Sequence, residues 1–404
     1  MGVSRSVKDA LAGSSMIRKM FEEGIQLKKQ YGADKVFDFS LGNPDTDPPK
    51  EFHDVFIKLA QEDEKGSHGY MPNAGYPFVR EAIAKKISRE QNVTTDGSNV
   101  IMTAGAAGGL NVIFKAICNP GDEIIVPSPF FVEYRAYAAN HQIKLVEIDT
   151  LDDFNPDINA IAAALNEKTA AVLINSPNNP TGKVYSACVL ASLANVLTEY
   201  NQKNSRTVYL VCDEPYREIA YIDVPPFLGC YKNSIVVSSY SKNLSLSGER
   251  IGYIAVNPDI NDKDDLLNGM TYCNRVLGFV NAPALMQRIV AQLTETGVDL
   301  SLYERKRDIF MKVLDAAGIE YAVPEGTFYF FCKVPQRAKG KEQAAEGKDQ
   351  TIDKEFVEHL KKYLILGVPA TSFGKSGWVR FAYCVSENTI TASGDAFKAA
   401  METW

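Results

Sequence analysis

The chain has 404 residues, of which 45% are apolar and 23% are charged, with a formal net charge of −7. This length predicts one large domain and a smaller one, and the composition is ordinary for a folded globular protein. The negative charge argues against nucleic acid as a partner, no apolar stretch is long enough to predict a membrane span, and the N-terminus lacks the apolar core of a signal peptide.

Short apolar runs alternate with helical patterns between about residues 100 and 256. Continuous β-branched runs separated by helices predict a mostly parallel sheet covered on both faces, which is an α/β fold. Strands are expected at 99–103, 122–129, 143–149, 170–177, 207–215, 234–241 and 251–257, and helices at 108–117, 157–166 and 187–200. Ligands of such sheets bind at the carboxyl ends of the strands, where this chain carries "TAGAAGG", "PSPFF", "NSPNNPTG", "DEPY" and "SYSK".

The pattern changes after Pro283 to long helices, a hairpin-like segment at 327–335 and a late strand at 378–384. These elements predict a second, α+β domain that the N-terminal segment completes. We therefore expect an N-terminal segment at 1–49, a large domain at 50–289 and a small domain at 290–404. The charged stretch 336–350 is interpreted as a solvated loop.

The cysteines and histidines give no sign of a disulfide framework or of a metal site. Seven cysteines are scattered without a CxxC pair, and several lie in apolar runs, which favours buried thiols in a reducing cytoplasm. The four histidines are too far apart for metal-ligand spacing, so no metal is expected.

The stretch "VVSSYSKNLSLSGERIGY", residues 236–253, places Lys242 in a serine-rich turn after an apolar run. A lone lysine at a strand end is more often a surface residue. The other polar strand ends share one explanation with this lysine if Lys242 forms a Schiff base with pyridoxal phosphate. Asp213 in "VCDEPY" could then keep the pyridine nitrogen protonated, so that the ring accepts electrons from a carbanion.

The remaining parts of such a cofactor also find candidates. Tyr216 and Asn179 could donate to the phenolic oxygen of the ring. The phosphate could be held by Arg250, Ser239 and the helix that starts after Gly105. "TAGAAGGL" is neither the dinucleotide G-x-G-x-x-G nor a Walker loop, which argues against nicotinamide or ATP.

These motifs resemble those of the class I aminotransferases of pyridoxal phosphate fold type I, the aspartate aminotransferase family. The resemblance covers nearly the whole chain, from "LGNPDTDPP" to "WVRFAYC". "SSYSKNLSLSGERIG" is similar to the family's lysine signature S-x-S-K-x-x-x-x-x-G-x-R-x-G, and "NSPNNPTG" with "DEPY" is specific in combination. The resemblance implies a large domain with a mostly parallel seven-stranded sheet and a smaller α+β domain.

The resemblance also implies a role for each matching residue. Lys242 would hold the cofactor and move the α-proton of the substrate, with Asp213, Tyr216 and Asn179 on the ring. The phosphate would contact Ser239, Arg250 and the amides of Ala106 and Ala107. Phe131 matches an aromatic residue that stacks on the ring, and a plain core position is the alternative.

Three further matches concern the substrate and a second subunit. Arg380 matches the arginine that holds the α-carboxylate, although a single arginine on a strand could form a surface ion pair. Gly42 matches an N-terminal strip that closes over that carboxylate, where Asn179 also contacts the substrate. Tyr70 resembles a tyrosine given to the phosphate across a homodimer interface, and a surface-loop tyrosine is the alternative.

The expected activity is transfer of an amino group from an L-amino acid, with aspartate favoured, to a 2-oxo acid such as 2-oxoglutarate. "PFFVEY" and "AAGG" depart from the usual family motifs and leave the side-chain pocket open to question. An aromatic or broad-range aminotransferase and a C–S β-lyase on the same scaffold are the alternatives. An effector-binding half of a transcription regulator is rejected, because only about forty residues precede "LGNPD". Arg275 is the candidate reader of a second carboxylate, with a surface arginine as the alternative.

Overall fold

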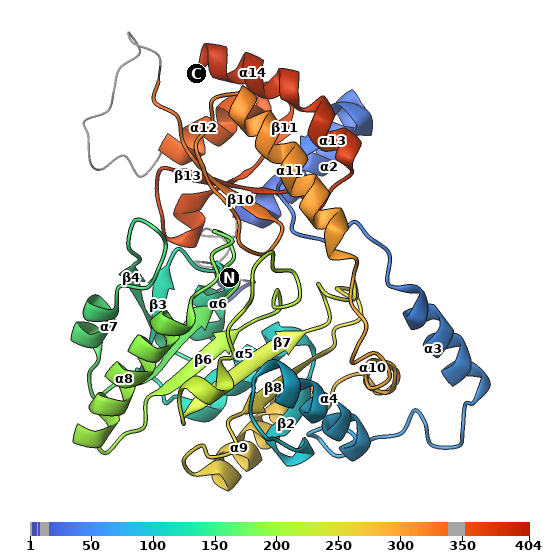
Figure 1. Cartoon of the computed structure of the whole chain (residues 1–404), viewed down its shortest axis with the longest axis vertical. Coiled ribbons are helices and arrows are strands. Elements are labelled where there is room, and N and C mark those ends of the chain that lie inside the picture. Colours follow the sequence, from blue (N-terminus) through green and yellow to red (C-terminus); the bar gives the residue numbers. More distant parts are fainter. Residues whose placement is uncertain (1, 6, 9–15, 338–351) are drawn as a thin grey trace.

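The computed structural model describes residues 2–5, 7–8, 16–337 and 352–404. A seven-stranded sheet in the order β2-β8-β7-β6-β5-β3-β4 forms its centre (Figure 1). Strand β8 runs antiparallel to both of its neighbours, and the other pairs are parallel. The strands are β2 (Val100–Thr103), β3 (Glu123–Ser128), β4 (Lys144–Asp149), β5 (Thr169–Asn175), β6 (Tyr209–Asp213), β7 (Ser234–Ser239) and β8 (Gly252–Val256). The predicted α/β fold with a mostly parallel seven-stranded sheet is confirmed.

Helices cover both faces of this sheet because successive strand side chains point to opposite sides. Ile235 and Val237 pack with α5, α6 and α9, whereas Val236 between them packs with α4, α7, α8 and α10. These helices are α4 (Pro77–Glu90), α5 (Gly105–Ile117), α6 (Glu133–Asn140), α7 (Ile158–Ala164), α8 (Ala187–Lys203), α9 (Lys263–Val276) and α10 (Ala284–Val290). Apolar burial on both faces explains the continuous apolar runs in the sequence.

A second core joins the N-terminal segment to the C-terminal third of the chain. Met20 and Phe39 pack with apolar residues between Tyr303 and Trp404, and β1 pairs with β11 in parallel. An antiparallel sheet in the order β12-β13-β10-β9 lies beside this core. In Figure 1 the blue α2 lies next to the orange and red helices of the C-terminal region. Met20 and Phe39 thus share a core with the C-terminal third of the chain, and the predicted domains with boundaries at 49/50 and 289/290 stay predictions.

The remaining elements have the following bounds. The helices are α2 (Met16–Tyr31), α3 (Lys50–Gln61), α11 (Leu300–Ala316), α12 (Ile352–Lys361), α13 (Glu387–Ala392) and α14 (Gly394–Thr403). The strands are β1 (Phe37–Asp38), β9 (Tyr321–Ala322), β10 (Tyr329–Lys333), β11 (Ile365–Leu366), β12 (Val368–Pro369) and β13 (Trp378–Ala382). Short 3-10 turns are η1 (Ala33–Lys35), η2 (Gly97–Asn99), η3 (Leu228–Cys230) and η4 (Ala370–Phe373).

Helices α6 and α9 are absent from the elements predicted from the sequence, and most of the solvated loop predicted at 336–350 lies outside the described residues. Within the part of the chain that the structure describes, no helix is both long and apolar enough to cross a membrane.

Candidate active site

A cavity of about 370 Å³ lies at the carboxyl ends of the central strands, where the parallel topology brings several strand ends to one edge. Most of the residues singled out from the sequence line this cavity. They are Gly42, Ala106, Ala107, Phe131, Asn179, Asp213, Tyr216, Ser239, Lys242, Arg250 and Arg380. The structure therefore brings together side chains from residue 42 to residue 380 in one place.

Lys242 lies in the turn after β7 and points into the cavity. Its Nζ donates to the carbonyl oxygen of Gly42 at 2.6 Å and lies 5.9 Å from the ring centre of Tyr216. Burial lowers the pKa of Lys242 to about 8, and the nearby guanidinium groups of Arg380 and Arg250 act in the same direction. A lysine with such a pKa is partly neutral near pH 7, which is the form that attacks an aldehyde.

Asp213, the last residue of β6, is a buried carboxylate with half of its hydrogen-bonding capacity in use. Tyr134 donates to Oδ2 at 2.6 Å, whereas Oδ1 is buried without a partner among the described residues. Burial raises the pKa of Asp213 to about 7, and the Tyr134 bond opposes that rise. An unpartnered carboxylate oxygen at the wall of a cavity fits a cationic N–H donor, such as a protonated pyridine nitrogen.

The start of α5 and Arg250 together form a positively charged cradle. The first amides of a helix have no intrahelical partner, and Ala106 and Ala107 supply such amides to the cavity. Gly105 has φ +72°, and a Cβ at this position would lie 2.6 Å from Nη2 of Arg250. Only glycine therefore allows the guanidinium to lie against the helix start. With Ser239 beside them, these groups suit a phosphate.

Arg380 on β13 is a buried cation whose hydrogen-bond partners are neutral. Its Nη1 donates to Oδ1 of Asn179 at 3.1 Å and its Nη2 to the carbonyl oxygen of Ser40 at 2.8 Å. Nε has no partner within the described chain, and the guanidinium carbon lies 4.4 Å from the ring centre of Tyr329. A buried charge needs a counter-charge, so this arginine is suited to a carboxylate that enters the cavity.

The segment around Gly42 closes one side of the cavity. A Cβ on Gly42 would lie 1.8 Å from the hydroxyl oxygen of Tyr329, so the strip can approach the cavity only with glycine at this position. The hydroxyl of Tyr329 in turn forms a 2.9 Å hydrogen bond with that of Tyr216.

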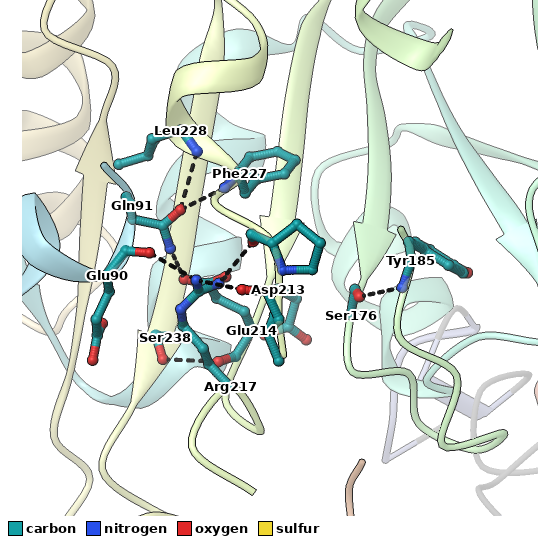
Figure 2. Close-up of polar contacts among 12 residues, drawn as sticks. Glu90, Gln91, Ser176, Tyr185, Asp213, Glu214, Arg217, Phe227, Leu228 and Ser238 are labelled. Atoms are coloured by element: carbon teal, nitrogen blue, oxygen red, sulfur yellow. Dashed lines mark hydrogen bonds and ion pairs between the residues drawn. The ribbon is translucent and has the colours of Figure 1, made fainter. Parts of the chain in front are cut away.

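A buried polar cluster lies beside the end of β6. Glu214 follows Asp213 directly, and its side chain accepts from Nε2 of Gln91 at 2.5 Å and from Nη1 of Arg217 at 3.2 Å. Ser238 donates to the backbone carbonyl of Glu214 at 3.1 Å (Figure 2). Burial raises the pKa of Glu214 to about 7, whereas Arg217 opposes the rise. None of these groups except Asp213 lines the cavity.

Two residues singled out from the sequence lie elsewhere. Tyr70 is 94% exposed, on the segment between α3 and α4, and is absent from the lining of the cavity of its own chain. Arg275 is exposed near the end of α9, where its guanidinium carbon lies 5.6 Å from the ring centre of Tyr272. It is absent from the lining of the cavity of its own chain, because its side of α9 faces outward while the neighbouring Asn274 is buried.

The sequence analysis also missed groups that the fold brings to the site. Tyr134 was not considered, although it follows Phe131 by three residues and contacts it edge to face at 5.6 Å. Asn175 at the end of β5 donates to the backbone carbonyl of Asp213 at 2.6 Å, and Tyr329 was missed as well. A polar residue at the end of a predicted strand was a signal for Asn175. No local pattern distinguished Tyr329.

Comparisons with known proteins agree with one another. A family model described as "Aminotransferase class I and II" matches residues 34–396. The "Aspartate/prephenate aminotransferase" of Thermus thermophilus is 30% identical over 98% of this chain and 98% of its own length. The "Probable aspartate/prephenate aminotransferase" of Aquifex aeolicus is 32% identical over 91% of each chain.

Solved structures show the same likeness. An "Amino Transferase" from Eubacterium rectale superposes with a TM-score of 0.92 at 34% identity and covers 100% of this chain and 99% of its own. The aspartate aminotransferase of Thermus thermophilus with maleate has a TM-score of 0.84 at 26% identity and covers 99% of this chain and 100% of its own.

Proposed function

Because the chain belongs to the class I and II aminotransferases, which use pyridoxal phosphate, we propose that it moves the amino group of L-aspartate to a 2-oxo acid such as 2-oxoglutarate. One observation carries the assignment of the site. A lysine of lowered pKa, a half-partnered buried carboxylate and a buried arginine without a counter-charge line the same cavity. The names of the relatives support aspartate as the donor.

The proposed mechanism follows from these residues. Pyridoxal phosphate supplies an electron sink for the carbanion that remains when the α-proton of the amino acid leaves. Asp213 would keep the pyridine nitrogen protonated through its free Oδ1, and Tyr216 and Asn179 would donate to the ring oxygen. Arg250, Ser239 and the amides of Ala106 and Ala107 would hold the phosphate, and Phe131 would pack on the ring.

The substrate is oriented by a separate set of groups. Arg380 would bind its α-carboxylate in a site shielded from water, because its Nε has no partner and each Nη keeps a second N–H beside its bond to Asn179 or Ser40. Lys242 would then remove the α-proton with its neutral Nζ and carry that proton as an ammonium until it is returned. The strip at Gly42 excludes water from this step.

The side chain of the substrate is a separate question. The cations that line the cavity are Lys242, Arg250 and Arg380, and each already has a role. Leu41, Phe131 and Tyr137 are among the apolar and aromatic groups of the lining. This lining favours an aromatic or broad-range aminotransferase as the second candidate, unless a partner subunit supplies a cation for aspartate. Arg275, exposed on α9, is our candidate for that cation.

Two measurements test these proposals. Borohydride reduction of the yellow protein should attach the cofactor covalently to Lys242, and Lys242→Ala should abolish turnover in a folded protein. Cofactor found on another lysine would contradict the assignment. A panel of aspartate, phenylalanine and methionine with 2-oxoglutarate should show a preference for aspartate and form glutamate. Ammonia and pyruvate would indicate a β-lyase, and a preference for phenylalanine would overturn the aspartate assignment.

We also propose a homodimer with shared active sites. Tyr70 is exposed, yet the backbone beside it is held from within: Asn274 donates to the carbonyl of Asn73 at 2.9 Å, and the N–H of Tyr76 donates to Gln287 at 3.0 Å. Asn274 and Gln287 are fully buried. A rigid loop that presents an exposed tyrosine suits contact with a second copy. The apolar side chains of Phe56, Ile57 and Phe78 are exposed on the flanking helices.

Mixed dimers test the shared site. Pairing Tyr70→Phe chains with Lys242→Ala chains would create one site that lacks both groups and one that keeps both. Activity should recover above that of either parent homodimer. No recovery in confirmed heterodimers would show that Tyr70 does not act across the interface. We propose a cytoplasmic location on the basis of the seven unpaired cysteines, which suit a reducing compartment.

A further inference from the structure

A chain of three polar side chains, Lys86, Glu218 and Asn243, lies outside the lining of the cavity. The Nζ of Lys86 and the Nδ2 of Asn243 both donate to Oε1 of Glu218, each at 2.7 Å. Lys86 belongs to α4, whereas Glu218 and Asn243 belong to the two turns that follow β6 and β7. The same oxygen therefore joins three separate parts of the fold.

These three polar residues include close neighbours of Lys242 and Tyr216 in the sequence. Asn243 follows Lys242, and Glu218 lies two residues after Tyr216 in the turn that follows Asp213. The Glu218–Asn243 bond thus links the turn that carries Tyr216 directly to the turn that carries Lys242. Since Lys242 lies beyond the last residue of β7, the sheet's hydrogen bonds do not fix its backbone.

The contacts of Asn243 replace the missing sheet bonds. Its backbone carbonyl accepts from the N–H of Val298 at 2.8 Å, and its side chain donates to Glu218. Its Oδ1 is buried and has no partner within the described residues, so the orientation of the amide depends on the bond to Glu218. The hydrogen bond from Nδ2 of Asn243 to Glu218 offsets part of the cost of leaving its buried Oδ1 without a partner.

Lys86 holds the carboxylate in place. Only 7% of its side chain is exposed, and it also pairs with Glu90 at 2.7 Å. Glu218 is more open, with 29% of its side chain exposed, and its Oε1 is taken up by Lys86 and Asn243. A lysine is seldom buried this deeply unless it is paired. Here the paired carboxylate is that of Glu218, which lies in the turn after β6.

We propose that Glu218 and Asn243 are positioning residues for Lys242, with Lys86 as their anchor. The inference rests on the proposed role of Lys242. Glu218 holds Asn243, Asn243 fixes the turn, and the turn sets where the Nζ of Lys242 lies relative to Tyr216 and the cofactor. A misplacement of about 1 Å in such a group can lower a rate about a hundredfold.

The test exchanges the two partners of the hydrogen bond. Asn243→Asp places two carboxylates against each other, and adding Glu218→Gln restores a donor–acceptor pair with the direction reversed. We expect Asn243→Asp to lower kcat about ten- to a hundredfold with the KM for the amino acid within about twofold. The rate at which pyridoxal phosphate becomes attached to Lys242 in the apoprotein, followed by absorbance, should fall in parallel. The double variant should recover both quantities.

The chain offers a matched control with the same chemistry. Glu123 on β3 accepts from Lys144 and from Asn166, each at 2.8 Å, at the amino end of the sheet. Asn166→Asp should lower the melting temperature, and adding Glu123→Gln should restore it. In both variants kcat and the attachment rate should stay at wild-type values. If Asn243→Asp does not fold, Asn243→Ala removes the donor without adding a charge and should show the same loss of kcat and attachment rate.

The outcomes separate this inference from the proposed function. A folded Asn243 variant with wild-type kcat and attachment rate would overturn the positioning role. An equal loss in the Asn166 control, or no recovery in the double variant, would also overturn it, because the effect would then be one of general stability. A wild-type protein that attaches pyridoxal phosphate to another lysine would instead overturn the role of Lys242 itself.

Discussion

Ionisable groups at the two ends of the seven-stranded sheet have pKa values shifted in opposite directions with respect to their charged forms. At the amino ends, Arg206 contacts Asp122 through both nitrogens at 2.9 and 2.5 Å, and this pairing lowers the pKa of Asp122. Hydrogen bonds from Asn166 and Lys144 likewise lower the pKa of Glu123. At the carboxyl ends, burial raises the pKa of Asp213 to about 7 and lowers that of Lys242 to about 8.

The ionisable groups at the amino ends are paired within the protein and stabilise the fold. Those at the carboxyl ends lack a full set of partners, which a bound ligand can supply. A carboxylate that is more stable ionised in the native state adds to the free energy of unfolding at neutral pH. A buried polar atom without a partner costs about 1–3 kcal/mol, and at the wall of a cavity a ligand can supply that partner. Asp213 and Arg380 have such atoms at one end of the sheet, and Asp122 and Glu123 have none among the described contacts.

The strongest test compares Asp213 with Glu123. Asp213→Ala should lower kcat by a factor on the order of 10³ or more, since it removes the charge that keeps the pyridine nitrogen protonated. Glu123→Gln should leave kcat near the wild-type value and lower the melting temperature, because it removes the charge that pairs with Lys144 and turns one of the two acceptor oxygens into a donor. Steady-state kinetics and thermal unfolding of both variants measure this. An Asp213→Ala enzyme within tenfold of wild type would contradict the role of Asp213.

The second test compares Arg380 with Arg206. Arg380→Gln should lower kcat/KM for the amino acid by a factor that corresponds to a loss of about 2–5 kcal/mol in transition-state binding, because a desolvated carboxylate would lose its charged partner. Arg206→Gln should reduce the free energy of unfolding and leave kcat/KM unchanged, since it breaks the pair with Asp122 far from the cavity. If Arg380→Gln kept its kcat/KM within about threefold of wild type, the carboxylate would have to bind elsewhere.

The sequence could predict the strands and the ligand-facing residues at their ends. Buried parallel strands leave continuous apolar runs, and the polar residues that follow Asn175, Asp213 and Ser239 stand out against them. The parallel topology then implied that these ends meet. Gly42 and Arg380, 338 positions apart in number, were placed by resemblance rather than by any local pattern.

The contacts across the cavity could not be predicted in this way. The bond from Tyr134 to Asp213 joins residues 79 apart, and that between Tyr216 and Tyr329 joins residues 113 apart. Such pairs depend on how α6 and β10 pack, and helix α6 is too short to show a clear periodicity. The exposed position of Arg275 could not be predicted either, because helical periodicity does not say which face of a helix points to the site.

The third test compares two buried tyrosines. Tyr134→Phe should lower kcat about tenfold, because loss of a hydrogen bond to a charged group costs about 1.5–3 kcal/mol and bound cofactor compensates part of it. Tyr231, at the amino ends of the strands, donates to the carbonyl of Val208 at 2.8 Å. Tyr231→Phe should affect unfolding and not kcat. Equal kinetics for the two variants would show that Tyr134 does not orient Asp213.

The weakest signal is expected in the pH dependence of unfolding of the apoprotein. The folded pKa of Asp213 is about 7, above its ordinary value of 3.8, so between these values the native state binds more protons than the unfolded chain. The free energy of unfolding should therefore fall as the pH rises from about 4 to about 7. Glu214 acts in the same direction, because its pKa is also raised to about 7.

Asp213→Asn separates the two contributions. It removes one of the carboxyl groups with a raised pKa and leaves Glu214 in place, so the fall should persist with a smaller slope. Lys242 contributes little to the slope in this range, since its folded pKa of about 8 lies above it. Asp122 and Glu123 titrate at lower pH because their pKa values are lowered. Urea unfolding of both apoproteins at several pH values across this range measures the slopes. Equal slopes would mean that Asp213 is already ionised in the folded apoprotein, and the contrast between the two ends of the sheet would then not hold for this carboxylate.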